Sequence, residues 1–173
     1  LSLKANLQDQ SNTGIIAEFK RKSPSKGVIN AGATVQDVTM AYMQYGAAGI
    51  SVLTDASFFG GALVDLETAT INKIPLLRKD FMISEYQIIE AKASGAAVIL
   101  LIAACLSPIQ VKQFSKLAHQ LGLEVLLEIH DDTELDHICD KVDLVGVNNR
   151  NLKNFEVNID ISLGLINQIP SDI

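Results

Sequence analysis

The chain lacks the features that define several protein classes. It has no tryptophan and only two cysteines, Cys105 and Cys139, with no CxxC pair and no Cys/His spacing that suits zinc. We therefore expect no disulfide framework, and we expect both thiols to be reduced and buried, because each lies in an apolar stretch. The longest apolar run, residues 96–106, is too short to span a bilayer, and residues 1–10 lack the apolar core of a signal peptide. These absences predict a cytoplasmic protein that has no contact with membranes.

Positive charge is also scarce. The 173 residues include 14 Lys and Arg against 20 Asp and Glu, which gives a formal charge of −6. A general nucleic-acid binder needs a basic face, so we expect no nucleic-acid partner. Such a balance still permits a local basic pocket for a small anion. With 48% hydrophobic residues, the chain can bury a sizeable core, and residues 1–173 are expected to form a single domain.

Short apolar runs alternate with longer amphipathic segments along the whole chain. The runs are rich in β-branched residues and almost continuous, which is typical of parallel strands covered on both faces. The predicted strands are Gly14–Phe19, Gly49–Thr54, Leu76–Arg78, Ala97–Ile102, Glu124–Glu128 and Asp143–Val147. The predicted helices are Thr34–Tyr45, Asp65–Ile71, Ser84–Ser94, Ser107–Leu121, Asp132–Cys139 and Ile159–Gln168.

Six strand–helix units in strict alternation predict a parallel α/β fold. Two architectures remain open at this point, an open doubly wound sheet and a (βα)8 TIM barrel. A barrel usually needs eight units and about 250 residues. If the fold is a barrel, we expect this chain to supply about six units of an incomplete barrel domain, lacking part of each end and chiefly the last two units.

Charged and amide side chains occur where several predicted strands end. Side chains alternate between the two faces of a strand. Because Ile15, Ala17 and Phe19 form an apolar face, Glu18 should point the opposite way, toward the interior. The same alternation applied to the other strands predicts a shared group of inward side chains at one end of the sheet: Glu18, Lys20, Lys79, Glu128, Asn148 and Arg150. Ligands of parallel α/β folds bind at this end. The group could instead be a structural salt-bridge network, but the excess of cations in it favours a site for a phosphate or a carboxylate.

Several motifs resemble the indole-3-glycerol-phosphate synthase family. The most specific is IIAEFKRKSPSKG, from Ile15 to Gly27, around the first predicted strand and its loop. The others follow in order and with suitable spacing over essentially the whole chain: GISVLTD, PLLRKDF, EAKASGAAVILLIA, GLEVLLEIH and VGVNNRNL. The resemblance implies a TIM barrel that converts 1-(2-carboxyphenylamino)-1-deoxyribulose 5-phosphate to indole-3-glycerol phosphate. Carbon dioxide and water would be lost, and no cofactor or metal would be needed.

The resemblance also implies roles for individual residues. Lys79 would be the general acid in ring closure, and Glu128 the general base in the later dehydration. Glu18 and Lys20 match active-site positions, and Lys20 would also contact the phosphate and share the acid role. Asn148 would orient Glu128 and polar groups of the substrate.

Further positions match the part of the family site that holds the aromatic ring. Ser23 and Arg150 would lie near the carboxylate of the anthranilate moiety. Phe59, Phe81 and Leu100 would form the apolar pocket around the ring. The expected state is a monomer or a homodimer, with other enzymes of tryptophan synthesis as possible neighbours.

Two other interpretations remain. One is another phosphate-binding barrel, such as a phosphoribosyl isomerase, whose reaction would use a Cys/Asp acid–base pair at strand ends that the sequence does not indicate. The other is an inactive barrel fragment that serves in folding or assembly. The complete set of inward polar residues argues against the second interpretation.

Overall fold

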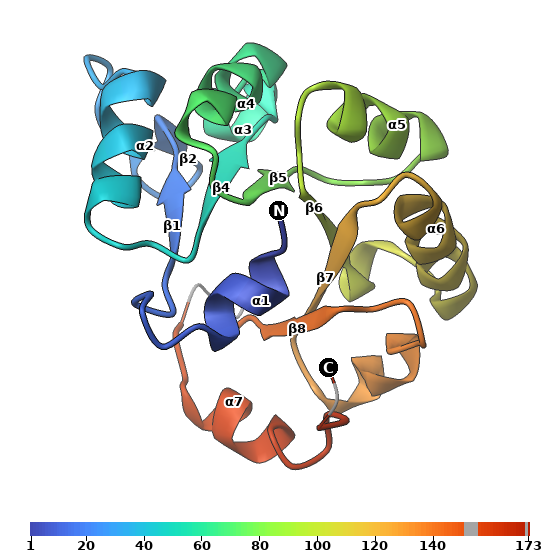
Figure 1. Cartoon of the computed structure of the whole chain (residues 1–173). Coiled ribbons are helices and arrows are strands. Elements are labelled where there is room, and N and C mark those ends of the chain that lie inside the picture. The colour runs from blue at the N-terminus through green and yellow to red at the C-terminus, as the bar shows by residue number, and fades with distance from the viewer. Residues whose placement is uncertain (151–155, 172) are drawn as a thin grey trace.

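Six strands form one parallel sheet in a computed structural model, which describes residues 1–150, 156–171 and 173. Each strand after the first pairs with the strand of this sheet that precedes it in the chain, and Figure 1 shows the six arranged along an arc with helices outside it. They are β1 (Ile16–Phe19), β4 (Gly49–Leu53), β5 (Leu76–Lys79), β6 (Val98–Ile102), β7 (Glu124–Ile129) and β8 (Leu144–Val147).

The order of the strands decides between the two expected architectures. A doubly wound sheet reverses its strand order at a switch point, where the chain begins to add strands to the opposite edge. Here the spatial order is β1-β4-β5-β6-β7-β8, the same as the chain order, and every pair is parallel. The curled sheet is therefore part of a TIM barrel, and the prediction of a barrel with about six units is confirmed.

Helical segments follow the strands and cover the outside of the sheet (Figure 1). They are α2 (Val35–Gln44), α4 (Leu63–Ala69), α5 (Glu85–Ala93), α6 (Pro108–Gln120), η3 (Asp132–His137) and α7 (Asp160–Leu165). The side chain of Thr34 accepts a hydrogen bond from the Asp37 N–H and begins α2. Ser107 does the same for α6, where Pro108 is the first helical residue. The segment expected to be an α-helix over Asp132–Cys139 is a 3-10 helix instead, which suits its short length.

The two faces of the sheet contact separate apolar clusters. On the outer face, Phe19 is buried among residues of the helices, with Ala17 packed beside it. On the inner face, Ile16 packs against a cluster that includes Leu3, Leu77 and Leu100. Burying one such side chain contributes about 1.5–3 kcal/mol. The predicted division of the first strand into an outward apolar face and an inward face is confirmed for Ala17 and Phe19, whereas Ile15 precedes β1 and is exposed.

Several short elements were not expected from the sequence. They are α1 (Leu3–Gln8), the hairpin of β2 (Lys22–Ser23) and β3 (Gly27–Val28), α3 (Ala56–Phe59), η1 (Thr70–Asn72) and η2 (Ala103–Cys105). None is long enough to give a readable hydrophobic period.

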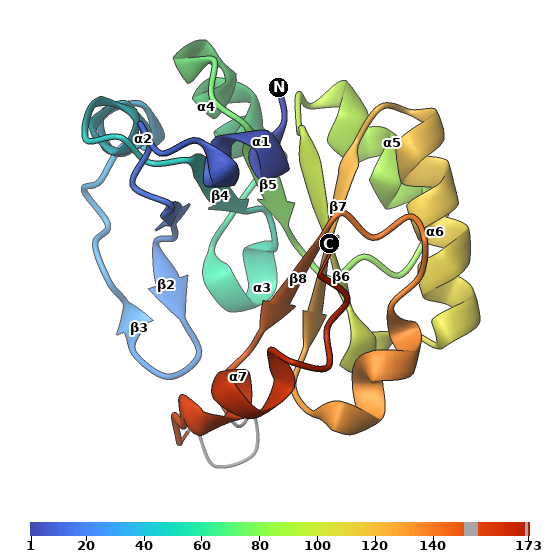
Figure 2. The same ribbon diagram turned by 60° about the horizontal axis from the view of Figure 1, so that its bottom comes forward.

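The first of these elements, α1, lies across the end of the sheet from which the strands begin, whereas β2, β3 and α3 lie at the opposite end (Figure 2). The carboxylate of Glu124, at the start of β7, accepts hydrogen bonds from the backbone N–H of Leu3 at 2.7 Å and of Lys4 at 3.3 Å, and from Ser2. Leu3 is fully buried. This end of the barrel interior is thus covered by α1.

Candidate active site

A cavity lies at the carboxyl ends of the strands, where the sequence predicted a site. Five polar residues expected to meet there line it together: Glu18, Lys20, Lys79, Glu128 and Asn148. They come from β1, β5, β7 and the turns after β1 and β8. The convergence of polar side chains from distant parts of the sequence is therefore observed.

Glu18 connects the two lysines of the cavity. Its Oε2 lies 2.8 Å from the Lys79 Nζ, and its Oε1 lies 2.5 Å from the Lys20 Nζ. Burial raises the pKa of the Glu18 carboxyl, but the charge of Lys79 and the hydrogen bonds from both lysines outweigh it, so that the pKa lies below its ordinary value of 4.5. Glu18 is therefore an anion that holds two ammonium groups beside the cavity, and each ammonium has further hydrogens to donate.

Glu128 faces the cavity from the end of β7. The Asn148 Nδ2 donates a hydrogen bond to its Oε1 at 3.0 Å. The Nε2 of His130 lies 3.7 Å from the same oxygen, which is too long for a hydrogen bond. Asn148 thus fixes one carboxylate oxygen, and an arrangement of this kind suits a base that takes a proton with its other oxygen.

One wall of the cavity is apolar. Phe59 from α3, Phe81 from the loop after β5, and Leu100 from β6 all line it, as expected. The ring of Phe81 also contacts that of Phe58 edge to face, with centroids 6.2 Å apart. A flat aromatic group that enters the cavity would meet carbon on this side and charged groups on the other.

Two predicted binding residues are not among the cavity-lining residues. Ser23 lies on β2, and its Oγ is 3.5 Å from that of Ser25. Arg150 is exposed and pairs through its backbone with Val157. Their roles in binding a carboxylate stay predictions.

The charge balance of the cavity differs from the expected excess of cations. Among the described lining residues, two lysines face four carboxylates, because Asp55 and Asp80 join Glu18 and Glu128 while Arg150 does not. The prediction of a locally positive site was wrong in this respect. All four carboxylates have partners, however, and Glu128 accepts from Asn148. Glu18 holds the two lysines, Asp55 accepts from the Phe58 and Phe59 N–H groups, and Asp80 pairs with Arg78.

The sequence did not single out six further lining residues: Leu53, Asp55, Asp80, Ile102, Ala104 and Cys105. The two aspartates each lie one or two residues beyond a strand, and that position was the signal that could have identified them. Cys105 was expected to be buried, and this was wrong, because it belongs to η2 and is exposed. The thiol is nevertheless partly desolvated at the cavity, and this desolvation, together with the charges of Glu128 and Glu134, raises the pKa of Cys105 above its ordinary value of 9.0.

In the part of the chain that the structure describes, no three His, Cys, Asp or Glu side chains form a group that could hold a metal ion. Within the same residues, none of the helices has both the length and the hydrophobicity needed to cross a membrane.

The fold and the cavity together define a βα-barrel with an active-site-like group at the carboxyl ends of its strands. A sequence model of the family "Indole-3-glycerol phosphate synthase" matches residues 1–173, and the chain belongs to this family. Two curated relatives carry the same description. The one from Bacteroides thetaiotaomicron is 48% identical over 163 residues, and the one from Polaromonas sp. strain JS666 is 47% identical over 160 residues.

The matched segments cover 94% and 91% of this chain, but only 63% and 61% of the two relatives. The chain thus spans less than two thirds of the length of these relatives. Among solved structures, one described as "Native KDPGal structure" superposes with a TM-score of 0.60 and 13% identity, over 95% of this chain and 71% of that one. At this identity the likeness concerns the fold alone.

Proposed function

We propose that the protein converts 1-(2-carboxyphenylamino)-1-deoxyribulose 5-phosphate to indole-3-glycerol phosphate in tryptophan biosynthesis, as an indole-3-glycerol-phosphate synthase. The observation that carries the proposal is the joint placement of the Lys79–Glu18–Lys20 cluster and the Glu128–Asn148 pair around one cavity with an aromatic wall. The reaction needs an acid at a carbonyl oxygen, a base at a departing proton, and a surface for a flat ring.

Ring closure would take place beside Lys79. The aromatic carbon that bears the carboxylate attacks the ketone carbon of the substrate, while Lys79 donates a proton to the ketone oxygen, which becomes a hydroxyl group. Glu18, at 2.8 Å, holds the ammonium in place. The aromatic ring would lie against Phe59, Phe81 and Leu100, so that the attacking carbon faces the lysine.

The next two steps restore aromaticity. The ring-closed iminium accepts the electrons of the bond to the carboxylate, which leaves as carbon dioxide. The hydroxyl group then leaves as water with a proton from Lys20 or Lys79, while Glu128 accepts the proton from the carbon beside the nitrogen. The donation from Asn148 holds Glu128 for this step. One proton is taken up overall, since a carboxylate leaves as a neutral gas.

The cavity contains a cysteine and two aspartates, the residue types that the isomerase interpretation requires. Their surroundings, however, do not suit general acid–base catalysis. The raised pKa of Cys105 keeps its thiol protonated near neutral pH. Asp55 caps α3, and Asp80 accepts from Arg78, Thr54 and its neighbour Phe81. The geometry therefore favours the synthase.

The site would receive a small phosphorylated anion, with Lys20 as the phosphate contact and Ser23 and Arg150 near the substrate carboxylate. A monomer or homodimer in the cytoplasm, beside other enzymes of tryptophan synthesis, is part of the same proposal. The two cysteines are unpaired, which suits a reducing compartment.

The test follows indole fluorescence after the carboxyphenylamino substrate is added to the full-length protein. We expect an indole product together with one equivalent of carbon dioxide. A folded full-length protein that gives neither would refute the proposal and would favour the isomerase or the inactive fragment. An assay with a phosphoribosyl aldose substrate separates those two.

A further inference from the structure

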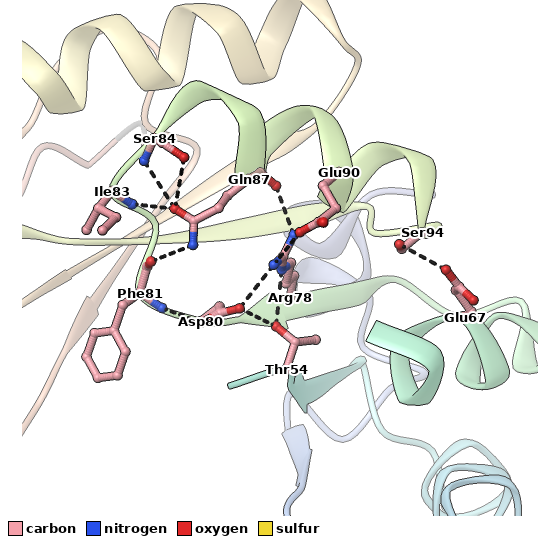
Figure 3. Close-up of polar contacts among 10 residues, drawn as sticks. All are labelled: Thr54, Glu67, Arg78, Asp80, Phe81, Ile83, Ser84, Gln87, Glu90 and Ser94. Carbon is pink, nitrogen blue, oxygen red and sulfur yellow. Dashed lines mark hydrogen bonds and ion pairs between the residues drawn. The ribbon is translucent and has the colours of Figure 1, made fainter. Parts of the chain in front are cut away.

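Arg78 lies beside Lys79 in the sequence but on the opposite face of β5. Its guanidinium is almost completely buried, with 4% of the side chain exposed, and Figure 3 shows it surrounded by polar groups. Its Nε donates to the Thr54 Oγ1 at 3.1 Å, and its Nη1 donates to the Gln87 carbonyl at 3.0 Å. Its Nη2 lies 3.1 Å from the Asp80 carboxylate and 2.9 Å from that of Glu90. One side chain therefore joins the ends of two strands to α5.

The hydrogen-bond network around Arg78 extends into the loop between β5 and α5. Thr54 donates to the Asp80 Oδ2 at 2.6 Å, and the other oxygen of Asp80 accepts from the Phe81 N–H at 2.9 Å. The side chain of Gln87 accepts from the Ile83 N–H at 2.9 Å and donates to the Phe81 carbonyl at 2.9 Å. Both backbone polar groups of Phe81 are thus held by side chains (Figure 3).

Each anchored residue is next to a residue of the cavity wall. Thr54 lies between Leu53 and Asp55, which both line the cavity, and Asp80 lies between Lys79 and Phe81, which line it as well. A shift of Arg78 and its hydrogen-bond partners would therefore move Lys79, the proposed acid, together with Phe81, which is proposed to bind the aromatic ring. Buried ion pairs contribute little net stability, so this concentration of bonds to one buried cation calls for another explanation.

We propose that Arg78 is a positioning residue, which acts through Thr54 and Asp80 to fix the Lys79 ammonium and the Phe81 ring relative to each other. The inference rests on the proposed function of the cavity. Among the described partners of Arg78, only Asp80 lines the cavity. The effect of Arg78 on turnover therefore passes through the backbone of β5 and of the loop that follows it.

The test compares Arg78→Lys and Thr54→Val with the control Ser94→Ala in the full-length protein. Lysine keeps the charge but has one nitrogen in place of three, so it cannot serve all four partners. Thr54→Val removes the hydrogen bonds of Thr54 with Arg78 and with Asp80, and it leaves the guanidinium paired with Asp80 and Glu90. Ser94 also bonds at α5, to Glu67 at 3.2 Å, but it lies at the opposite end of that helix from Ser84 (Figure 3), and it is not among the lining residues of the cavity.

We expect kcat to fall about 10-fold or more in both test variants, with KM within about threefold of the wild type, and no such change in Ser94→Ala. The kcat is expressed per folded molecule, with the folded fraction taken from circular dichroism. Test variants whose kcat per folded molecule stays within twofold of the wild type would overturn the proposal, whatever their melting temperatures, because a purely structural role changes only the folded fraction.

Hydrogen exchange at residues 79–84 gives a readout that does not depend on activity. Exchange there should become faster in Arg78→Lys and Thr54→Val but not in Ser94→Ala; unchanged exchange in both test variants contradicts the proposal. If the wild type makes no indole product, the proposed function fails, and hydrogen exchange still decides whether Arg78 positions this loop.

Discussion

The Lys79 ammonium lies 2.8 Å from the Glu18 Oε2, although 61 positions separate the two residues in the chain. The contact exists because β1 and β5 both pair with β4, which lies between them, and both side chains face the barrel interior. It orients the proposed acid of the ring closure, and the first prediction concerns this lysine.

Lys79→Ala should lose turnover while retaining the fold. The substitution removes the proposed proton donor, and general acids contribute typically 10²–10⁴-fold. Glu18 keeps Lys20 as a partner, so the carboxylate is not left unpaired. The measurement is indole formation together with circular dichroism, and Lys92→Ala, a lysine that bonds to the Gly122 carbonyl on the outside of the barrel, is the matched control. Turnover near that of the wild type would remove Lys79 from this role.

Glu128→Gln should also lose turnover, by a similar factor, because an amide has no basic oxygen to accept the proton during dehydration. The shape of the side chain is kept, so the melting temperature should change little. Stopped reactions should contain the ring-closed, decarboxylated hydroxyl compound, detected by mass spectrometry. The exposed Glu85→Gln on α5 serves as the control. An unchanged rate of indole formation in Glu128→Gln would be inconsistent with a base at this position.

Stability should depend on Glu18 at acidic pH. Its pKa is lower in the folded protein than its ordinary value of 4.5, so the unfolded chain binds more protons as the pH falls through that value. The contribution of Glu18 is therefore fully present above about pH 5.5 and is lost as the pH drops through the folded pKa. In chemical denaturation at several pH values, Glu18→Gln should show a shallower loss of stability below pH 4.5 than the wild type. Parallel curves for the two proteins would contradict the ion-pair assignment.

Cys105→Ser should leave turnover within about threefold of the wild type. The thiol lines the cavity, but its raised pKa keeps it protonated and a poor acid–base group at neutral pH. For the same reason, iodoacetamide should modify Cys105 in the wild type more slowly than a free cysteine, and the rate should still rise above pH 9. Peptide mass spectrometry follows the modification. A large loss of indole formation in the serine variant would instead show that the Cys105 thiol takes part in the reaction.

Gly61→Ala should destabilise the protein, whereas Gly164→Ala should not. A Cβ at position 61 would lie 2.0 Å from the backbone carbonyl oxygen of Leu53, a clash that only a backbone shift can relieve. At position 164, in α7, a Cβ meets nothing within 4 Å, and alanine favours a helix over glycine by about 0.5–1 kcal/mol. Thermal melting of the two variants provides the comparison. Because Gly61 lies two residues after Phe59, the last residue of α3, its alanine variant should also raise KM.

The sequence allowed the strands and their inward side chains to be predicted because alternation along a strand is a local property. Once Ala17 and Phe19 were assigned to the helix-facing side, Glu18 had to face the interior. The cavity residues of β5 and β7 followed from the same rule.

Other features depend on contacts between segments that no local pattern reveals. Arg78 faces outward from a strand, and its partners come from a turn, a strand end and a helix. The position of α1 depends on Glu124, more than 100 residues away. Cys105 was expected in the core because it lies in an apolar run, but the chain turns into η2 (Ala103–Cys105) within that run.

The agreement between spatial and chain order in the sheet has a consequence for synthesis of the protein. Every later strand of this sheet finds a neighbour already made when it leaves the ribosome, and only the outer edge of β1 waits for a later segment. Neighbouring strands are also consecutive in this sheet along the chain, which limits the entropic cost of closing the connection between them. The wall of the barrel can therefore grow by one strand at a time, in the direction of translation.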